Sequence, residues 1–263
     1  MSVELVYTLN GPSGAPVVVL SNSLGTTWEM WAPQVPALQT NFRVLRYNTR
    51  GHGGSPAPAG PYEIADLADD LIELLDRLEI ERATICGVSI GGMTAMRIAA
   101  DHPERVERLV LCATSASMAP PEPWHERAAL VRAEGMEPVI EATVGRWFTP
   151  EFVSEDPPVV ARTRAIIAST DPEAYASCCE AIAAMDLRED VRGIQAPALV
   201  ISGSDDPAAP PEAGALIAER IPGASFEVVP NARHLVSLQR PEIVTPLILD
   251  HLDHLDPHSE DTR

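Results

Sequence analysis

Short apolar runs alternate along the chain with longer stretches in which apolar residues recur every three to four positions. Short runs favour buried strands, whereas the longer spacing is typical of amphipathic helices. The apolar runs cover residues 3–9, 17–20, 42–47, 83–86, 109–112, 198–201 and 226–229. The helical spacing covers residues 64–78, 93–100, 211–220 and 243–252. Such an alternation predicts an α/β fold, with a mostly parallel sheet covered by helices on both faces.

The alternation is interrupted once, between residues 118 and 191. This stretch has helical spacing without a convincing strand, and it holds most of the aromatic residues of the second half of the chain. We interpret residues 118–191 as a helical lid inserted between two strands of the sheet. The core domain is then formed by residues 1–117 and 192–263.

The chain has 263 residues, a length that suits one large domain or two small ones. Its composition narrows the classes of molecule that it can bind. Its formal net charge is −19, and all 19 of its basic residues are arginine. A strongly negative protein repels phosphate backbones and anionic lipids, so we expect neither nucleic acid nor membrane as a partner. Without lysine, the chain has no phosphate-binding P-loop lysine and no residue for a Schiff base.

The cysteines and the N-terminal sequence give no sign of a metal, a cofactor or secretion. Cys86, Cys112, Cys178 and Cys179 form neither a C-x-x-C pair nor a disulfide framework. Three histidines near the acidic C-terminus are only weak metal candidates: His251, His254 and His258. The first residues lack the basic and apolar parts of a signal peptide, and no apolar run reaches the length of a membrane span. We therefore expect a cytoplasmic protein without metal or cofactor.

The motif Gly87-x-Ser89-x-Gly91 follows a predicted strand and precedes a predicted helix. Strand, sharp turn and helix form the context of a nucleophile elbow, in which a serine sits on a strained turn between small residues. The helix that follows points its N-terminus at the serine, where free N–H groups favour a developing oxyanion. We therefore predict that Ser89 is a catalytic nucleophile.

A serine nucleophile needs a base that is oriented by an acid. In hydrolases with this elbow the order along the chain is serine, acid, histidine. Two acids, Asp205 and Asp206, follow the predicted strand 198–201, and we favour Asp206 over Asp205. His234 follows the last predicted strand, which places it at the same edge of the sheet as Ser89. His52 lies in a glycine-rich loop and is predicted to be structural.

Two backbone N–H groups are needed to stabilise the oxyanion. One is expected from Ile90, directly after the nucleophile. The other is expected from the loop that follows strand 17–20, where Leu24 is the candidate.

With these motifs, the chain resembles the α/β-hydrolase superfamily, and most closely the 3-oxoadipate enol-lactonases. The resemblance rests on the stretches 21–26, 30–31, 47–53, 87–92, 146–150, 175–179, 185–188 and 206–211. It implies Ser89, Asp206 and His234 as the catalytic triad, and Leu24 and Ile90 as the oxyanion donors. It also implies that Trp124 covers the substrate. The chain departs from the family pattern at Asn48, where aspartate is usual, and at residues 235–239, where the family sequence is more polar.

The predicted function is a serine hydrolase that opens an enol-lactone through an acyl-enzyme. The substrate would carry a carboxylate, and in a chain without lysine its partner must be arginine. Arg132 and Arg146 are the candidates, and Trp124, Trp147 and Phe148 are expected to form the apolar wall. The alternatives are a carboxylesterase or a cofactor-free perhydrolase that acts on a small ester. A third hypothesis is a non-catalytic protein of the same fold that binds a small molecule.

Overall fold

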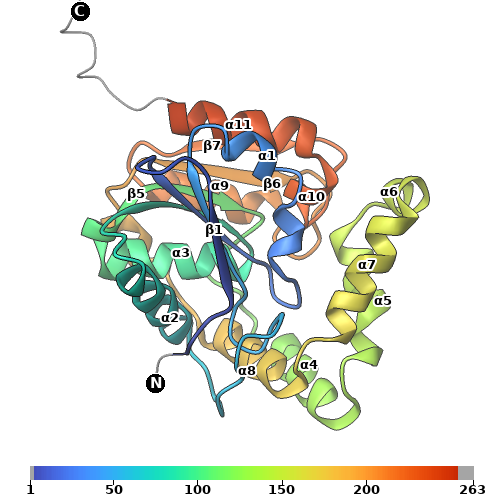
Figure 1. Cartoon of the computed structure of the whole chain (residues 1–263). Coiled ribbons are helices and arrows are strands. Elements are labelled where there is room, and N and C mark those ends of the chain that lie inside the picture. The colour runs from blue at the N-terminus through green and yellow to red at the C-terminus, as the bar shows by residue number, and fades with distance from the viewer. Residues whose placement is uncertain (1–2, 254–263) are drawn as a thin grey trace, which may run out of the picture.

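A computed structural model describes residues 3–253, so His254 and His258 lie outside the described residues. Its strands form one sheet in the order β1-β3-β2-β4-β5-β6-β7 (Figure 1). Only β1 is antiparallel, and it pairs with β3 at one edge. The strands are β1 (Tyr7–Asn10), β2 (Val17–Ser21), β3 (Arg43–Tyr47), β4 (Ala83–Val88), β5 (Val106–Cys112), β6 (Ala198–Gly203) and β7 (Ser225–Val229). The predicted fold class is confirmed.

Helices cover both faces of this sheet. They are α1 (Val35–Leu38), α2 (Ile64–Arg77), α3 (Ile90–Asp101), α9 (Pro211–Arg220), α10 (Val236–Gln239) and α11 (Pro241–Asp253). Figure 1 shows α1 and α11 on one face, with α2 and α3 on the other. Every residue of the inner strands β2, β4 and β6 is buried, which explains why they read as unbroken apolar runs. No helix within residues 3–253 has the length and apolar character that a membrane crossing requires.

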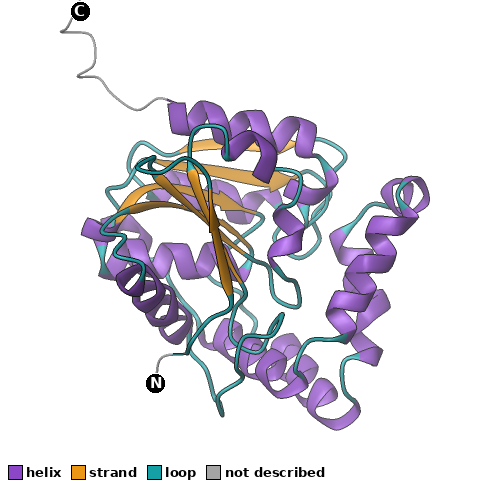
Figure 2. Cartoon of the chain, in the orientation of Figure 1, coloured by secondary structure: helices purple, strands orange, loops and turns teal. Residues whose placement is uncertain are grey.

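All regular structure between β5 and β6 is helical. The helices are α4 (Glu122–Glu134), α5 (Ile140–Trp147), α6 (Pro150–Glu155), α7 (Pro157–Ala168) and α8 (Pro172–Ala184). Three of them begin in the same way, with a side chain that caps the first turn and a proline directly after it. The capping residues are Thr149, Asp156 and Asp171. Figure 2 shows this helical insertion as a separate arch beside the sheet, and an antiparallel bridge between Ser117 and Asp186 closes its base.

The short elements and the first strand differ from the prediction. A 3-10 helix (η1, Trp28–Trp31), α1 and α10 have four residues each, so they are too short to show a helical period. The first strand begins at Tyr7 instead of residue 3. Val3 is buried, but its N–H donates to the Asp70 carboxylate (3.2 Å) instead of pairing with a strand.

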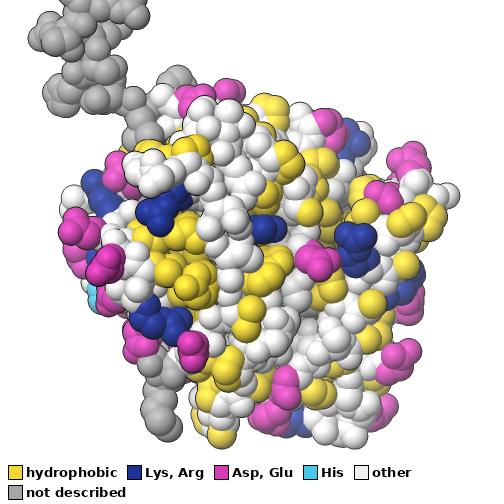
Figure 3. All heavy atoms as spheres, in the orientation of Figure 1, with side chains coloured by type: hydrophobic (Ala, Val, Ile, Leu, Met, Phe, Trp, Pro, Cys, Tyr) yellow, Lys and Arg dark blue, Asp and Glu magenta, His cyan; other side chains and the backbone are white. Residues whose placement is uncertain are grey.

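Acidic and basic side chains are interspersed over the face seen in Figure 3, with apolar atoms between them. Many surface arginines form ion pairs, such as Arg164 with Glu141 and Arg188 with Asp186. These ion pairs leave only some of the described arginines without a carboxylate partner.

Candidate active site

Ser89 lies between β4 and α3 on a strained turn. Its backbone has φ 58° and ψ −120°, in the region that residues other than glycine rarely adopt. The turn is tight because the chain packs against itself. A Cβ on Gly87 would lie 2.3 Å from the carbonyl oxygen of Gly91, and one on Gly91 would lie 2.5 Å from that of Ser21. The two glycines of the motif are therefore required by close backbone contacts, and the turn has the geometry of a nucleophile elbow.

His234 and Asp206 are hydrogen-bonded at the same edge of the sheet. The distance from His234 Nδ1 to Asp206 Oδ2 is 2.8 Å, and both side chains are buried. The other carboxylate oxygen of Asp206 accepts hydrogen bonds from the N–H groups of Ala208 (2.8 Å) and Ala209 (3.1 Å). Asp206 thus holds Nδ1 of the ring and leaves Nε2 for a proton from a nucleophile. Of the two acids that the sequence left open, Asp206 contacts the histidine, whereas Asp205 is exposed.

A pocket of about 190 Å³ opens above these residues, between the sheet and the helical insertion. Ser89, His234 and Leu24 are among the residues that line it. Most of its other lining residues come from the insertion and include Trp124 and Trp147, both of which were predicted. Phe148 does not line the pocket. It is buried and stacks on Phe152, with 4.9 Å between the ring centroids.

The loop after β2 leaves one N–H group available to the pocket. The Ser23 N–H donates to the Met30 sulfur (3.3 Å), and the Gly25 N–H donates to His52 Nε2 (2.9 Å). Within the described part of the chain, the Leu24 N–H between them has no acceptor. Ile90 is the first residue of α3, so its N–H has no acceptor within that helix. Both predicted oxyanion donors, Leu24 and Ile90, thus have backbone N–H groups without an acceptor in the loop or helix that carries them.

The predicted arginines behave differently from each other. Arg146 lines the pocket, and its Nη2 donates to the Thr143 hydroxyl (3.0 Å). Arg132 is not among the lining residues, because its guanidinium pairs with Glu173 and Glu180.

Arg127, which the sequence analysis did not select, lines the pocket together with Arg146. Its guanidinium lies 4.5 Å from the centroid of the Trp124 ring, and its positive charge favours the ionised form of the Tyr175 hydroxyl. The signal in the sequence was its spacing. Arg127 is three residues after Trp124 on one helix and shares its face, whereas Arg132 lies about 140° around the helix from Arg127.

These two arginines make the pocket positively charged in a strongly negative protein. Among residues 3–253, neither Arg127 nor Arg146 has a carboxylate partner. Burial and the positive charge of Arg127 both lower the pKa of Arg146. Burial also raises the pKa of Tyr175 to about 12, so this hydroxyl is a neutral hydrogen-bonding group at physiological pH. An anion that enters the pocket would relieve the repulsion between the two guanidinium groups.

The two departures from the family pattern, at Asn48 and at residues 235–239, place side chains that link separate segments of the chain. Asn48 accepts a hydrogen bond from the Trp28 N–H (2.9 Å) and donates one to the Gly53 carbonyl (2.9 Å). An ionised aspartate could only accept. Gln239 accepts from the Arg233 N–H (3.0 Å) and donates to the Thr149 hydroxyl (2.8 Å), which ties the histidine loop to the helical insertion.

Within residues 3–253, no group of three or more His, Cys, Asp or Glu side chains is placed to bind a metal ion. The four cysteines are buried and unpaired. Burial raises the pKa of Cys112 to about 12, so this thiol stays protonated.

Comparisons with known proteins show which family the chain belongs to. The family model for the alpha/beta hydrolase fold matches residues 16–241. The 3-oxoadipate enol-lactonase 2 of Acinetobacter baylyi is 39% identical over 91% of this chain and 90% of its own. The crystal structure of the enol-lactonase from Burkholderia xenovorans is 47% identical, with a TM-score of 0.94 over 95% of this chain and 97% of that chain. A thermophilic esterase from Thermogutta terrifontis is 30% identical, with a TM-score of 0.89 over 95% and 93% of the two chains.

The chain therefore belongs to the α/β-hydrolase fold family. It is a hydrolase of carboxylic esters, and the resemblance to enol-lactonases that its motifs indicated is confirmed.

Proposed function

We propose that this protein opens an enol-lactone of the 3-oxoadipate enol-lactone type by serine catalysis. The observation that carries the proposal is one pocket that holds Ser89, His234 and two arginines without carboxylate partners. A neutral ester gives no reason to place two half-buried guanidinium groups in the pocket of the nucleophile. A lactone that carries a carboxylate does, because that carboxylate can pair with both.

The proposed chemistry proceeds through an acyl-enzyme. His234, held by Asp206, removes the Ser89 proton as Oγ attacks the lactone carbonyl carbon. The N–H groups of Leu24 and Ile90 stabilise the tetrahedral oxyanion. The ring C–O bond then breaks, the enol oxygen leaves with a proton from His234, and the enol becomes a ketone. Water activated by His234 hydrolyses the acyl-enzyme and frees Ser89.

The helical insertion supplies the substrate side of the site. We propose that residues 118–191 act as the lid over a core of residues 1–117 and 192–263. Arg127 and Arg146 would bind the substrate carboxylate, and Trp124 and Trp147 would pack against its carbon chain. By analogy with its enol-lactonase relatives, we place the enzyme in the β-ketoadipate pathway of aromatic catabolism, in the cytoplasm.

The first test compares two substrates. Opening of 3-oxoadipate enol-lactone, followed by loss of its ultraviolet absorbance, is measured beside hydrolysis of p-nitrophenyl acetate. We expect fast opening of the lactone and slow cleavage of the ester. In the Ser89→Ala variant both activities should fall to background while the circular dichroism spectrum is unchanged. Activity that survives this substitution would show that Ser89 is not the nucleophile.

The second candidate is an esterase for another small ester, which the 30% identical esterase structure favours. Cleavage of p-nitrophenyl acetate without opening of the lactone would support it. A fluorophosphonate probe separates both enzymes from a non-catalytic binding protein, because only an activated Ser89 is labelled. The denatured chain and the Ser89→Ala variant are the controls.

A further inference from the structure

The buried imidazole of His52 takes no part in the proposed chemistry, yet both of its nitrogens are hydrogen-bonded. Nδ1 lies 2.9 Å from the Arg50 carbonyl oxygen, and Nε2 lies 2.9 Å from the Gly25 nitrogen. A carbonyl can only accept and an amide N–H can only donate, so Nδ1 carries the proton and Nε2 offers a lone pair. The ring is therefore neutral and held in one tautomer. Burial lowers the pKa of His52 and outweighs the Arg50 carbonyl and the Asp171 carboxylate, which both favour the charged form.

Through its bond to the Gly25 N–H, His52 holds the loop that carries the Leu24 N–H. The Gly25 N–H is the next amide along the chain from Leu24, so the bond to Nε2 fixes the orientation of the peptide groups around it. Asn48, from the same segment as His52, accepts a hydrogen bond from the Trp28 N–H on the other side of this loop. Side chains of residues 48–53 thus fix the oxyanion loop at two points.

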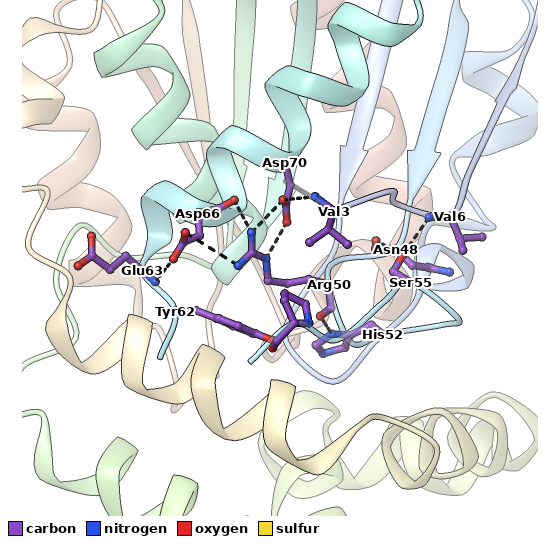
Figure 4. Close-up of polar contacts among 11 residues, drawn as sticks. Val3, Val6, Asn48, Arg50, His52, Ser55, Tyr62, Glu63, Asp66 and Asp70 are labelled. Atoms are coloured by element: carbon purple, nitrogen blue, oxygen red, sulfur yellow. Dashed lines mark hydrogen bonds and ion pairs between the residues drawn. The ribbon is translucent and has the colours of Figure 1, made fainter. Parts of the chain in front are cut away.

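Residues 48–53 are themselves firmly anchored. Figure 4 shows His52 beside Arg50, whose guanidinium points to Asp70 and Asp66 on α2. Arg50 forms a bidentate pair with Asp70, with nitrogen–oxygen distances of 2.7 and 2.8 Å. The Asp171 N–H, at the start of α8, donates to the Gly51 carbonyl (3.2 Å), so the helical insertion rests on the same segment. Because residues 48–53 are anchored in this way, His52 Nε2 can hold the Gly25 amide in a fixed position.

We propose that His52 is a positioning residue for the oxyanion site: its Nε2 lone pair holds the Gly25 amide and thereby directs the Leu24 N–H at the substrate oxygen. The inference rests on the proposed function, because the role of Leu24 belongs to it. Stabilisation of an oxyanion is realised in the transition state and not in the bound substrate. Loss of the His52 acceptor should therefore lower kcat and leave KM almost unchanged.

Two conservative variants separate positioning from packing. In His52→Gln the side-chain oxygen can reach the place of Nε2, whereas the shorter His52→Asn reaches only the place of Nδ1. We expect His52→Gln to keep kcat for p-nitrophenyl acetate within about threefold, and His52→Asn to lower it by about 10- to 100-fold, part of the loss that follows removal of one oxyanion donor. KM should change little in both. His102→Asn, at a partly exposed histidine at the end of α3, is the matched control and should behave as the wild type.

Amide hydrogen exchange of Gly25 gives a readout that does not depend on turnover. Exchange should be slow in the wild type and in His52→Gln, and at least about tenfold faster in His52→Asn. Equal loss of kcat in both variants, a change in KM instead of kcat, or unaltered Gly25 exchange in His52→Asn would overturn the positioning role. A wild type that cleaves neither substrate and resists the fluorophosphonate probe would instead overturn the proposed function, and the exchange data would still decide whether His52 holds the loop.

Discussion

Arg50 and the pocket pair Arg127 and Arg146 show the same side chain in two settings. Arg50 is 4% exposed and meets Asp70, 2% exposed, in a bidentate ion pair. Arg127 and Arg146 lie in the pocket beside Ser89, and no carboxylate of the described chain meets them. A guanidinium that already has its carboxylate stabilises the fold, whereas one that lacks it is available to a ligand. In the pocket beside Ser89, it is the combination of two neighbouring guanidinium groups and the missing carboxylates that points to an anionic ligand.

Arg132 supports the same distinction from the protein surface. It lies on α4, five residues after Arg127, yet it already pairs with Glu173 and Glu180. Because these two glutamates already pair with its guanidinium, Arg132 is not available to bind a substrate carboxylate. The comparison between paired and unpaired arginines can be tested by removing each kind in turn.

Removal of the buried ion pair should have the largest effect, and it should act on stability. Arg50→Met leaves the Asp70 carboxylate buried without its partner, which should lower the free energy of unfolding by about 3–5 kcal/mol. Urea denaturation followed by circular dichroism measures this loss. The double variant Arg50→Met with Asp70→Leu should recover much of it, since no buried charge then remains. A loss below about 1 kcal/mol would show that the pair is not the anchor of this segment.

Removal of Arg127 should act on catalysis instead. A charge-assisted hydrogen bond contributes about 1.5–3 kcal/mol, so Arg127→Met should lower kcat/KM for the enol-lactone by about 10- to 100-fold. Hydrolysis of p-nitrophenyl acetate, which has no carboxylate, should change by less than about threefold. Arg132→Met is the matched control and should leave both rates unchanged. Equal losses of kcat/KM on the two substrates would mean that Arg127 does not bind the substrate carboxylate.

Removal of Arg146 should stabilise the protein slightly while it weakens binding. Its guanidinium is desolvated and lies close to a second positive charge, so Arg146→Met should raise the free energy of unfolding by about 1 kcal/mol. Addition of adipate, a dicarboxylate, should raise the melting temperature of the wild type more than that of the variant. A variant that is less stable than the wild type would show that Arg146 serves packing instead.

The smallest expected effect is on the pH dependence of stability. It concerns His52, which lies two residues after Arg50 of the buried ion pair. The folded-state pKa of His52 lies below its ordinary value of 6.5, so the unfolded chain takes up this proton first as the pH falls. The contribution of the neutral ring is present above about pH 6.5 and is lost progressively as the pH falls toward the folded-state pKa. Asp171 and Arg50, which face the ring, are unchanged in His52→Gln. Acidification should therefore destabilise the wild type more than His52→Gln in urea titrations at several pH values.

The sequence by itself determined the order of strands and helices and the nucleophile elbow. Buried strands are apolar at most positions, and a strained turn between a strand and a helix accepts only small neighbours, so both leave a local pattern. The placement of Ser89 and His234 at one edge of the sheet followed as well, since the carboxyl ends of parallel strands meet there. The elements of four residues, η1, α1 and α10, were missed because so short a segment shows no period.

Only the tertiary structure decided which of several equivalent side chains meets the site. Asp205 and Asp206 are adjacent in sequence, and the path of the turn alone brings Asp206 to His234. Phe148 packs on Phe152 and leaves the pocket wall to Trp147. Among the arginines, the rotation of α4 turns Arg127 toward Ser89 and Arg132 toward two glutamates from α8. Contacts between segments far apart in the chain have no local signature, which is why these choices required the folded molecule.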